Sequence, residues 1–192
     1  DIDGSPWVYW ISNDIRELFL RLPRLGDLAK PRQGLATADN FRFLRFWWEV
    51  DERRVGFNHV NRKEAQDKGA RWFPHIKGGI HKWSKTEIDL VNWQNDGKEL
   101  QNFFHANGRL ASRPQNIDHY FFPCVVLTRV GPSGFTARFN PGGHVFDSGL
   151  SACFPSEDEL IISLTGILNS SLAFFLLTCL NSSLNFQVGD AE

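Results

Sequence analysis

Hydrophobic and polar positions near the start of the chain follow a helical pattern. The capping set Ser12–Asp14 is followed by apolar residues at helical spacing from Ile15 to Leu22. This pattern predicts a first helix that ends near Pro23. The next residues, 24–40, are rich in Gly, Pro, Asp and Asn, so they predict a turn with a short extended segment around Ala29–Gly34.

The stretch from Phe41 to Val50, FRFLRFWWEV, is mainly apolar on both faces of an alternating pattern. It predicts a strand that is buried on both sides and continues through residues 53–60. The alternative is a nucleic-acid surface, on which arginines neutralise phosphates and aromatic rings stack on bases. Because such stacking suits single strands better than a duplex, we expect the aromatic residues to form core. The polar turn Thr37–Asn40, with Arg42 at its edge, is then the part available to DNA.

The middle of the chain predicts short elements separated by turns. Residues 61–70 predict a polar helical turn, residues 71–79 and 87–93 predict strands that flank a Gly-Gly loop, and residues 96–104 predict a helix capped by Asp96. Three short strands at hairpin distances follow, over residues 120–130, 134–139 and 143–149.

The end of the chain predicts helices. Residues Pro155–Glu159 form a strong N-terminal signal, with acidic residues in the first turn. The segment Ile161–Leu180 has no charge over twenty residues, which is the length of a bilayer span. Polar residues from Gly166 to Ser171 divide it, so we expect two apolar helices or one bent helix in a soluble core, and no membrane partner.

The order of these elements predicts the fold class. A helix, then antiparallel strands, then helices, without strand–helix–strand alternation, indicates an α+β fold. We expect antiparallel strands in a twisted sheet or half-barrel, flanking helices and a C-terminal helical hairpin. The single domain 1–192 would comprise an N-terminal helix (1–23), a mainly β lobe (24–154) and C-terminal helices (155–192). The absence of Met, even at the first position, predicts a fragment of a longer protein.

Charge is distributed unevenly behind a formal net charge of −1. The net charge is −3 over residues 1–20, +6 over residues 21–120 and −4 over residues 121–192. A basic middle between acidic ends is typical of an anion-binding face, although a solvated surface of mixed charge is the alternative. The three cysteines are widely spaced and predict buried, reduced thiols in a cytoplasmic protein, and the six histidines lack the spacing of metal ligands.

Motifs of catalysis are absent from the sequence. Neither GxGxxG nor GxxxxGK[ST] nor GxSxG occurs. Glu49 and Asp147 are of catalytic type, but no spacing requires that role, so the sequence predicts no catalytic residue and no metal ligand.

Four polar clusters instead offer groups that bind nucleic acid. Arg, Asn and Gln read base edges, Lys and Arg hold phosphates, and a Gly-Gly pair lets the backbone approach a ligand. Each cluster alone is also explained by turn caps or exposed charges. The candidate DNA-binding residues are Lys30, Arg32, Gln33, Thr37, Asp39, Asn40, Arg42, Lys77, His81, Lys82, Arg109, Arg113, Gln115 and Asn116.

Five ordered segments resemble a known family. The first, RQGLATADNFRFLRFWWEV, resembles the G-x-x-T-G-x-N-x-x-F element that opens target-recognition regions of large adenine-specific DNA methyltransferases, and its longer form is similar to the BREX phage-defence methyltransferases. The others are WFPHIKGGIHKW with DLVNWQNDG, GRLASRPQN, FTARFNPGGHVFDSGLSACFP, and LTGILNSSLAFFLL with LNFQVGD. One position departs from the pattern, because Ala38 stands where the family usually has Gly. If residue 38 is left-handed, Ala is strained there by ~1 kcal/mol.

The resemblance implies a role and its limits. Such enzymes bind S-adenosylmethionine and hold a flipped adenine with an (N/D/S)-P-P-(Y/F) motif. Asn140–Gly143 lacks the second Pro and the aromatic residue of that motif. The cofactor is therefore expected in a catalytic domain outside this sequence, and this part would choose where the parent enzyme methylates.

The leading hypothesis is a DNA target-recognition domain of an adenine-N6 methyltransferase in phage defence or restriction-modification. Its expected partners are double-stranded DNA, the remainder of the methyltransferase chain and other defence-system proteins. The alternative is a structural or protein-interaction module of the parent protein that does not contact DNA. A Trp-rich carbohydrate-binding module is a third and weaker hypothesis.

Overall fold

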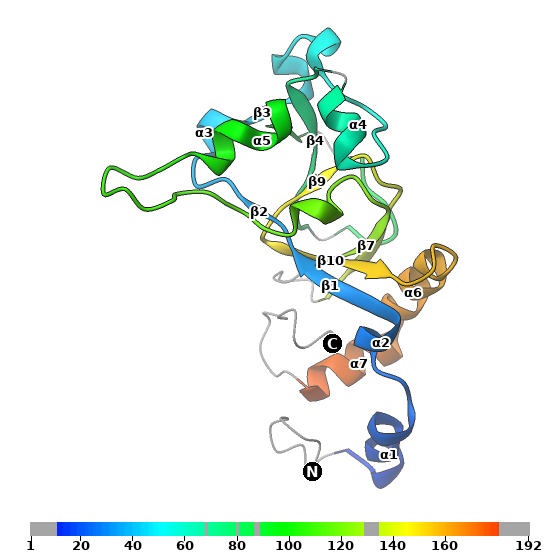
Figure 1. Cartoon of the computed structure of the whole chain (residues 1–192). Helices are drawn as coiled ribbons and strands as arrows, with labels where there is room; N and C mark the ends of the chain where they lie inside the picture. The colour runs from blue at the N-terminus through cyan, green and yellow to red at the C-terminus, as the bar shows by residue number, and fades with distance from the viewer. Residues whose placement is uncertain (1–10, 68, 80, 87–88, 129–134, 181–192) are drawn as a thin grey trace.

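The computed structural model describes residues 11–67, 69–79, 81–86, 89–128 and 135–180. Figure 1 shows an elongated molecule, in which the sheets occupy one part and helices α1, α6 and α7 gather at the other. The helices are α1 (Asn13–Arg21), α2 (Leu25–Leu28), α3 (Asn40–Phe43), α4 (Arg62–Asp67), α5 (Gln94–Gln101), α6 (Leu160–Leu168) and α7 (Ser171–Leu180), and the 3-10 turns are η1 (Trp47–Glu49), η2 (Glu52–Arg54) and η3 (Ile117–His119). The strands are β1 (Ala29–Gln33), β2 (Leu35–Ala36), β3 (Leu44–Phe46), β4 (Trp72–Ile76), β5 (Asp89–Asn92), β6 (Arg113–Pro114), β7 (Cys124–Thr128), β8 (Ala137–Asn140), β9 (Val145–Phe146) and β10 (Leu150–Pro155).

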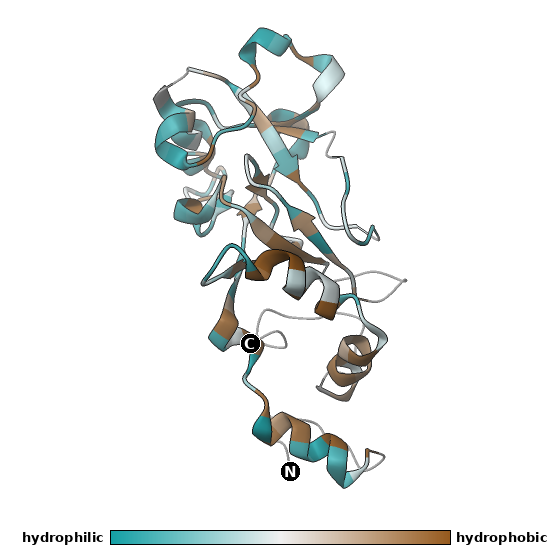
Figure 2. Cartoon of the chain, turned by 90° about the vertical axis from the view of Figure 1, so that its right-hand side faces the viewer, coloured by the Kyte–Doolittle hydropathy of each residue, from teal (hydrophilic) through white to brown (hydrophobic). Residues whose placement is uncertain are grey.

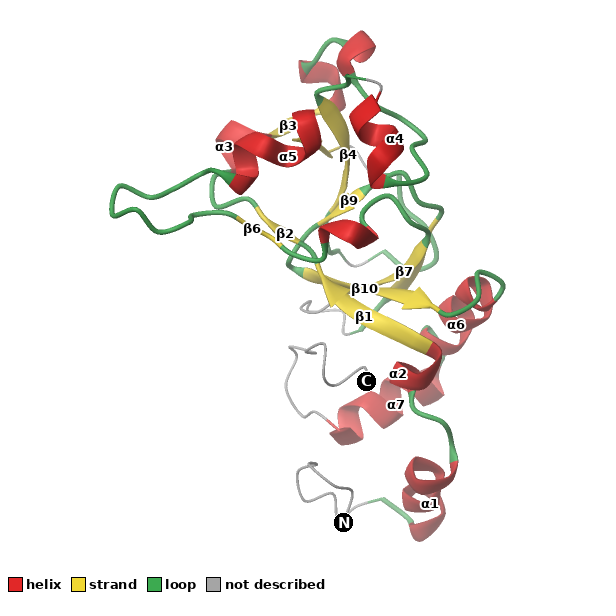
Figure 3. Ribbon diagram, viewed as in Figure 1, coloured by secondary structure: helices red, strands yellow, loops and turns green. Residues whose placement is uncertain are grey.

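The strands form two four-stranded sheets and one short ribbon (Figure 3). The first sheet has the order β1-β10-β7-β8 and is antiparallel throughout. The second has the order β3-β5-β4-β9, in which only the pairing of β4 with β9 is parallel. The ribbon pairs β2 with β6. The predicted α+β class, with antiparallel sheets, flanking helices and a C-terminal helical pair, is confirmed.

Two apolar clusters hold these layers together. The larger contains buried residues from both sheets, among them Phe73, Val91, Val126 and Ala152. The smaller lies between the first sheet and α6, because α6 turns Ile161, Leu164 and Leu168 toward that sheet. Figure 2 shows this concentration of apolar residues on the strands and α6, whereas the end that carries α4 and α5 is mainly hydrophilic. Burial of such side chains stabilises the fold by about 2 kcal/mol for each large residue.

Gly34 sets the distance between the two sheets where β1 gives way to β2. A Cβ atom added there would lie 1.9 Å from the carbonyl oxygen of Phe146 in β9. Only glycine allows this approach, since no side-chain carbon fits at that distance. Gly34 therefore brings the β2 segment against β9.

The predicted two-sided strand over Phe41–Val50 is wrong. Asp39 caps a helical turn at Asn40–Phe43, so alternate residues no longer share one face. Only Leu44–Phe46 is extended, at the edge of the second sheet. Phe43 and Leu44 are buried, but Phe41 is 94% exposed, and Trp47 and Trp48 are 58% and 56% exposed. Most of this aromatic run lies on the surface.

Three further local predictions are wrong. Residues 53–60 form no strand, because the 3-10 turn η2 occupies their start and only Val55 makes an isolated bridge. Asp96 does not cap α5, since Asn95, Asp96 and Gly97 are all left-handed and the Asp96 carboxylate pairs with Arg62. Residues Pro155–Glu159 do not form the first turn of a helix. Pro155 ends β10, which the sequence did not predict, and α6 begins at Leu160.

Other local predictions are confirmed. The first helix begins after Ser12, whose hydroxyl accepts a hydrogen bond from the amide of Ile15. Cys124, Cys153 and Cys179 are buried and form no disulfide. The segment Ile161–Leu180 is divided into α6 and α7, which meet at a bend of 69°. Its expected place in the core holds for α6 only, because α7 exposes Leu172, Phe174 and Phe175. In the described residues no single helix is long and apolar enough to cross a membrane. The two helices of this bent pair are long and apolar enough only when taken together. The motif LNFQVGD lies outside the described residues.

Candidate nucleic-acid interface

The ribbon of β2 and β6 brings together residues of three of the four predicted clusters, Gln33, Thr37–Arg42 and Arg109–Asn116. Ala36 pairs with Arg113 and Leu35 with Pro114. Just beyond the ribbon, the Asn116 side-chain amide donates to the carbonyl oxygen of Gln33 at 2.8 Å. Asn116 has a left-handed φ of 51°, which asparagine tolerates better than most residues. We call residues 33–42 with residues 103–116 the β2–β6 edge.

The turn Thr37–Asn40 is fixed by its own side chains. Thr37 is buried, and its hydroxyl bonds to the side-chain oxygen of Asn40. The Asp39 carboxylate accepts a hydrogen bond from the amide of Arg42 at 3.0 Å. Ala38 has a left-handed φ of 63°, so the expected strain at this position is present. Thr37 and Asp39 thus hold the turn, whereas Asn40 and Arg42 are exposed at its surface.

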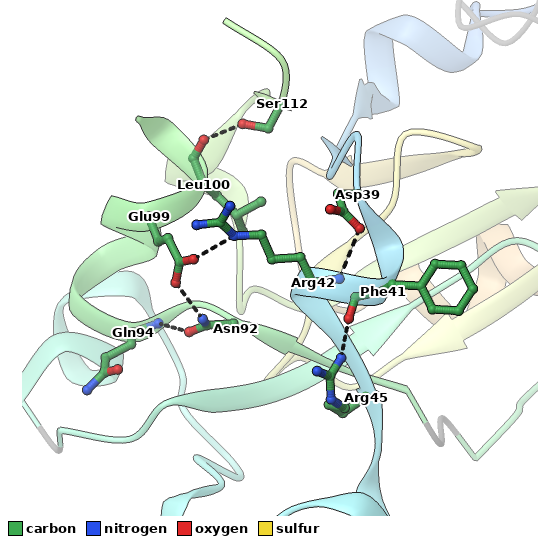
Figure 4. Close-up of polar contacts among 9 residues, drawn as sticks. All are labelled: Asp39, Phe41, Arg42, Arg45, Asn92, Gln94, Glu99, Leu100 and Ser112. Carbon is green, nitrogen blue, oxygen red and sulfur yellow. Dashed lines mark hydrogen bonds and ion pairs between the residues drawn. The ribbon is translucent and has the colours of Figure 1, made fainter. Parts of the chain in front are cut away.

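Glu99 of α5 holds the side chain of Arg42 (Figure 4). The Arg42 Nε atom lies 2.9 Å from Oε1 of Glu99, and the guanidinium lies 4.9 Å from the centroid of the Phe103 ring. The other Glu99 oxygen accepts from the Asn92 amide at 3.0 Å. Arg42 and Glu99 are about half exposed, so their pair contributes roughly 0–1 kcal/mol to stability. Its main effect is to orient the guanidinium at the surface.

A hairpin projects from this edge. The amide of Ala111 donates to the carbonyl of Phe103 at 2.8 Å, and the amide of His105 donates to the carbonyl of Arg109 at 2.8 Å. In Figure 3 it is the long loop between α5 and β6, which extends away from the body. At its base the Ser112 hydroxyl donates to the carbonyl of Leu100, also drawn in Figure 4. The projecting hairpin, residues 103–111, therefore carries Arg109 far from the core.

Cations at the β2–β6 edge differ in whether they are neutralised. Arg42 is paired with Glu99. The side chains of Arg109 and Arg113 are exposed and make no ion pair within the described part of the chain. Both are therefore available for an anion, and the phosphates of nucleic acid are one such anion.

Of the other candidates, Gln33 and Gln115 belong to the β2–β6 edge, and the others lie outside it. Gln33 donates to the carbonyl of Ser148 at 3.1 Å, and the next residue, Gly149, approaches Gly78. Lys77 is paired with Asp89 at 2.9 Å. The remaining candidates are Lys30 and Arg32 on β1, Gln115 beside β6, and His81 and Lys82 on the segment whose Trp83 bonds to β8.

Sequence reasoning missed the residues that position this surface. Glu99 and Asn92 orient Arg42, and Arg62 joins α4 to Asp96 and Asp118. The hydrogen bonds of Asp96 and Asp118 raise the pKa of Arg62 despite its desolvation. No local pattern marks these partners, since 57 residues separate Arg42 from Glu99 and 34 separate Arg62 from Asp96.

Two titratable groups with altered pKa values, the buried His75 and the partly exposed Asp147, lie where β4 pairs with β9. Burial, with the nearby charges of Lys77 and His144, lowers the pKa of His75 to about 3, so its imidazole is neutral at pH 7. Its Nε2 lies 3.9 Å from a carboxylate oxygen of Asp147. Burial also raises the pKa of Asp147, although a hydrogen bond from Gly149 and the charge of Lys77 oppose that shift.

Two features of the described residues bear on the binding of metals and nucleotides. They contain no group of three His, Cys, Asp or Glu side chains that could hold a metal. A cavity of about 230 Å³ lies beside β8, lined among others by Arg138, Asn140 and His144. Its glycines, Gly142 and Gly143, join β8 to β9 and do not lead from a strand into a helix, so they do not fit the phosphate- or nucleotide-binding loops that precede helices.

Comparison with known proteins places this chain beside one class of enzyme. Its similarity runs along its whole length to a segment of adenine-specific methyltransferases. One is the adenine-specific methyltransferase PglX of Lacticaseibacillus casei (strain Zhang), 30% identical over 191 residues, which are 98% of this chain and 16% of PglX. Another is the adenine-specific methyltransferase BrxX of Escherichia coli O9:H4 (strain HS), 35% identical over 196 residues, covering 100% of this chain and 15% of BrxX. The chain thus spans about one sixth of the length of these relatives. No family model matches the chain.

Proposed function

We propose that this chain supplies DNA sequence recognition to a site-specific adenine-N6 DNA methyltransferase of a BREX-type phage-defence or restriction-modification system. The pairing of β2 with β6 carries the proposal, because it gathers polar groups from positions 33–42 and 113–116 beside a projecting hairpin. The similarity to adenine-specific methyltransferases along the whole chain supports the enzyme class.

The roles divide by exposure and charge. Arg109 and Arg113, exposed and outside ion pairs in the described residues, contact phosphates and supply affinity that depends on salt. Asn40 and Arg42, presented by the capped turn, contact base edges, since Arg and Asn pair with guanine and adenine in the major groove. The projecting hairpin is two-stranded, with Phe104 opposite Leu110 in an antiparallel bridge, and the major groove admits a two-stranded ribbon.

The chemistry of methyl transfer lies elsewhere in this proposal. S-adenosylmethionine and the flipped adenine would be held by the rest of a larger cytoplasmic enzyme. Residues 24–154 would face DNA, and the helices of 1–23 and 155–192 would pack against that enzyme. Other proteins of the defence system are further partners in this scheme.

A salt titration tests the proposal. The full-length protein is mixed with a 30-bp duplex, and the Kd is measured between 50 and 200 mM salt. Replacing Arg109 and Arg113 by Ala should weaken binding and lower the slope of log Kd against log salt by about 0.9 for each phosphate that the variant no longer neutralises. The matched control replaces Arg21 and Lys63, which are exposed on α1 and α4. Absence of binding at 50 mM salt, or an unchanged slope in the Arg109/Arg113 variant, contradicts the proposal.

A second function is favoured by one observation. Phe46, Trp47 and Trp48 are exposed together, with Phe46 stacked on Trp48 at 4.7 Å, and α7 exposes Phe174 and Phe175. Such apolar surface is typical of a protein-interaction module. If Trp47→Ser and Trp48→Ser lower the melting temperature of the full-length protein while DNA binding is absent from the wild type, this second function replaces the first.

A further inference from the structure

Phe41 is the most exposed of the large apolar side chains in the described part of the chain. Its side chain is 94% exposed, against 78% for Leu20 and 74% for Ile162. Figure 4 shows its ring pointing away from Arg42 and Glu99, out of the turn that carries it. A ring that is almost fully exposed to water gains none of the free energy that burial normally gives a phenylalanine side chain.

The backbone that presents Phe41 is held rigidly. The carbonyl of Phe41 accepts a hydrogen bond from Nη1 of Arg45. On its two sides, Asp39 caps the amide of Arg42, and Phe43 is fully buried against Phe103 at 5.2 Å between ring centroids. The exposed ring therefore projects from a fixed support, so little backbone entropy is lost when it inserts into a partner.

Phe41 lies between two residues with hydrogen-bonding side chains in the sequence. Asn40 and Arg42 are its chain neighbours, and both are exposed. Phenylalanine is one of the apolar residues that DNA-binding proteins insert between base steps, while polar residues nearby contact the DNA.

We propose that Phe41 is a wedge that inserts between adjacent base pairs of the bound duplex and unstacks that step. This inference rests on the proposed function, because it requires duplex DNA at the β2–β6 edge. It goes beyond recognition, since it assigns to this chain a part in deforming the DNA. Unstacking lowers the cost of extruding a neighbouring base.

A pair of duplexes tests the wedge without knowledge of the target site. One is an intact 30-bp duplex, and the other has the same sequence with one central abasic site. The wild-type full-length protein should bind the abasic duplex about tenfold more tightly, because that step is already unstacked. Phe41→Ala should reduce the preference to less than about twofold, and Phe41→Leu should keep part of it. Phe57→Ala, which removes a half-exposed ring elsewhere, serves as the control and should keep the full preference.

The outcomes separate the wedge from the proposed function. Failure of the wild type to bind either duplex at 50 mM salt overturns both. If the wild type binds both duplexes in a salt-dependent way but shows no preference for the abasic one, only the wedge is overturned. The same holds if Phe41→Ala leaves the ratio of the two Kd values unchanged. If that result comes with a lower melting temperature for Phe41→Ala, Phe41 packs on another part of the full-length protein instead.

Discussion

Arg42 donates from Nε to Oε1 of Glu99 at 2.9 Å, and this contact ties the turn before β3 to helix α5. Because Glu99 also accepts from Asn92 at the end of β5, the turn, the sheet and the helix share one hydrogen-bonded group. The orientation of an exposed cation at the candidate interface is therefore set from within the fold.

A double-mutant cycle measures this contact. We expect Arg42→Ala and Glu99→Ala to show a coupling energy of about 0.5 kcal/mol in urea unfolding, since both side chains are half exposed. Glu99→Gln should barely change stability yet alter the discrimination between duplex sequences, because Arg42 is no longer held in one direction. A coupling energy well above 1 kcal/mol would show that the pair serves mainly stability.

The ion pair of Arg62 with Asp96 should contribute more to stability than the pair of Arg42 with Glu99. It is paired with Asp96, whose side chain is only 18% exposed, so Arg62→Ala leaves a largely buried carboxylate without its cation. We expect a loss of about 2 kcal/mol in the free energy of unfolding. The matched control is Asp118→Asn, because Asp118 is 82% exposed, and it should cost less than about 0.5 kcal/mol. Equal losses in the two variants would contradict this ranking.

Ala38→Gly should stabilise the protein. Ala38 has a φ of 63°, and a left-handed conformation costs a residue with a Cβ atom roughly 1 kcal/mol that glycine does not incur. We expect the midpoint of urea unfolding to rise with an unchanged slope. Asn58→Gly is the comparison, since Asn58 has a similar φ of 58° but asparagine tolerates it, and its gain should be smaller.

Stability should fall between about pH 6.5 and pH 3 through His75. Burial lowers its folded pKa to about 3, whereas the unfolded pKa is near 6.5, so the unfolded state binds more protons in this range. Unfolding free energy therefore decreases as pH falls, by at most about 1.4 kcal/mol per pH unit from this group. The lowered pKa of His119 also makes stability fall as pH falls. The raised pKa of Asp147 has the opposite effect as pH falls toward its unfolded value of 3.8, because the folded state then binds the proton first.

Comparing His75→Leu with the wild type isolates this effect. Because the substitution also changes packing at every pH, the quantity compared is the slope of unfolding free energy between pH 6.5 and pH 4. The slope should be shallower in His75→Leu, and Asp147→Asn provides the reference for the opposing carboxyl group. Parallel slopes in the wild type and His75→Leu would contradict the prediction.

The sequence by itself determined the elements that have local causes. Ser12 sets the start of α1 through its own hydroxyl, and the polar residues around Asn169 divide the last apolar segment into α6 and α7. The ordered motifs pointed to adenine-specific methyltransferases, to which the chain is similar along its length. These features depend on residues that are close in the sequence, so local sequence patterns are enough to predict them.

Only the tertiary structure decided which side chains face water and which polar groups meet. Phe41, Trp47 and Trp48 are residue types common in cores, but the helical turn α3 and the 3-10 turn η1 place them at the surface. The pairing of β2 with β6 brought Gln33 to Asn116 across 83 residues, and α5 brought Glu99 to Arg42 across 57. Such contacts depend on strand order and on the packing of distant segments, which the spacing of residues along the chain does not encode.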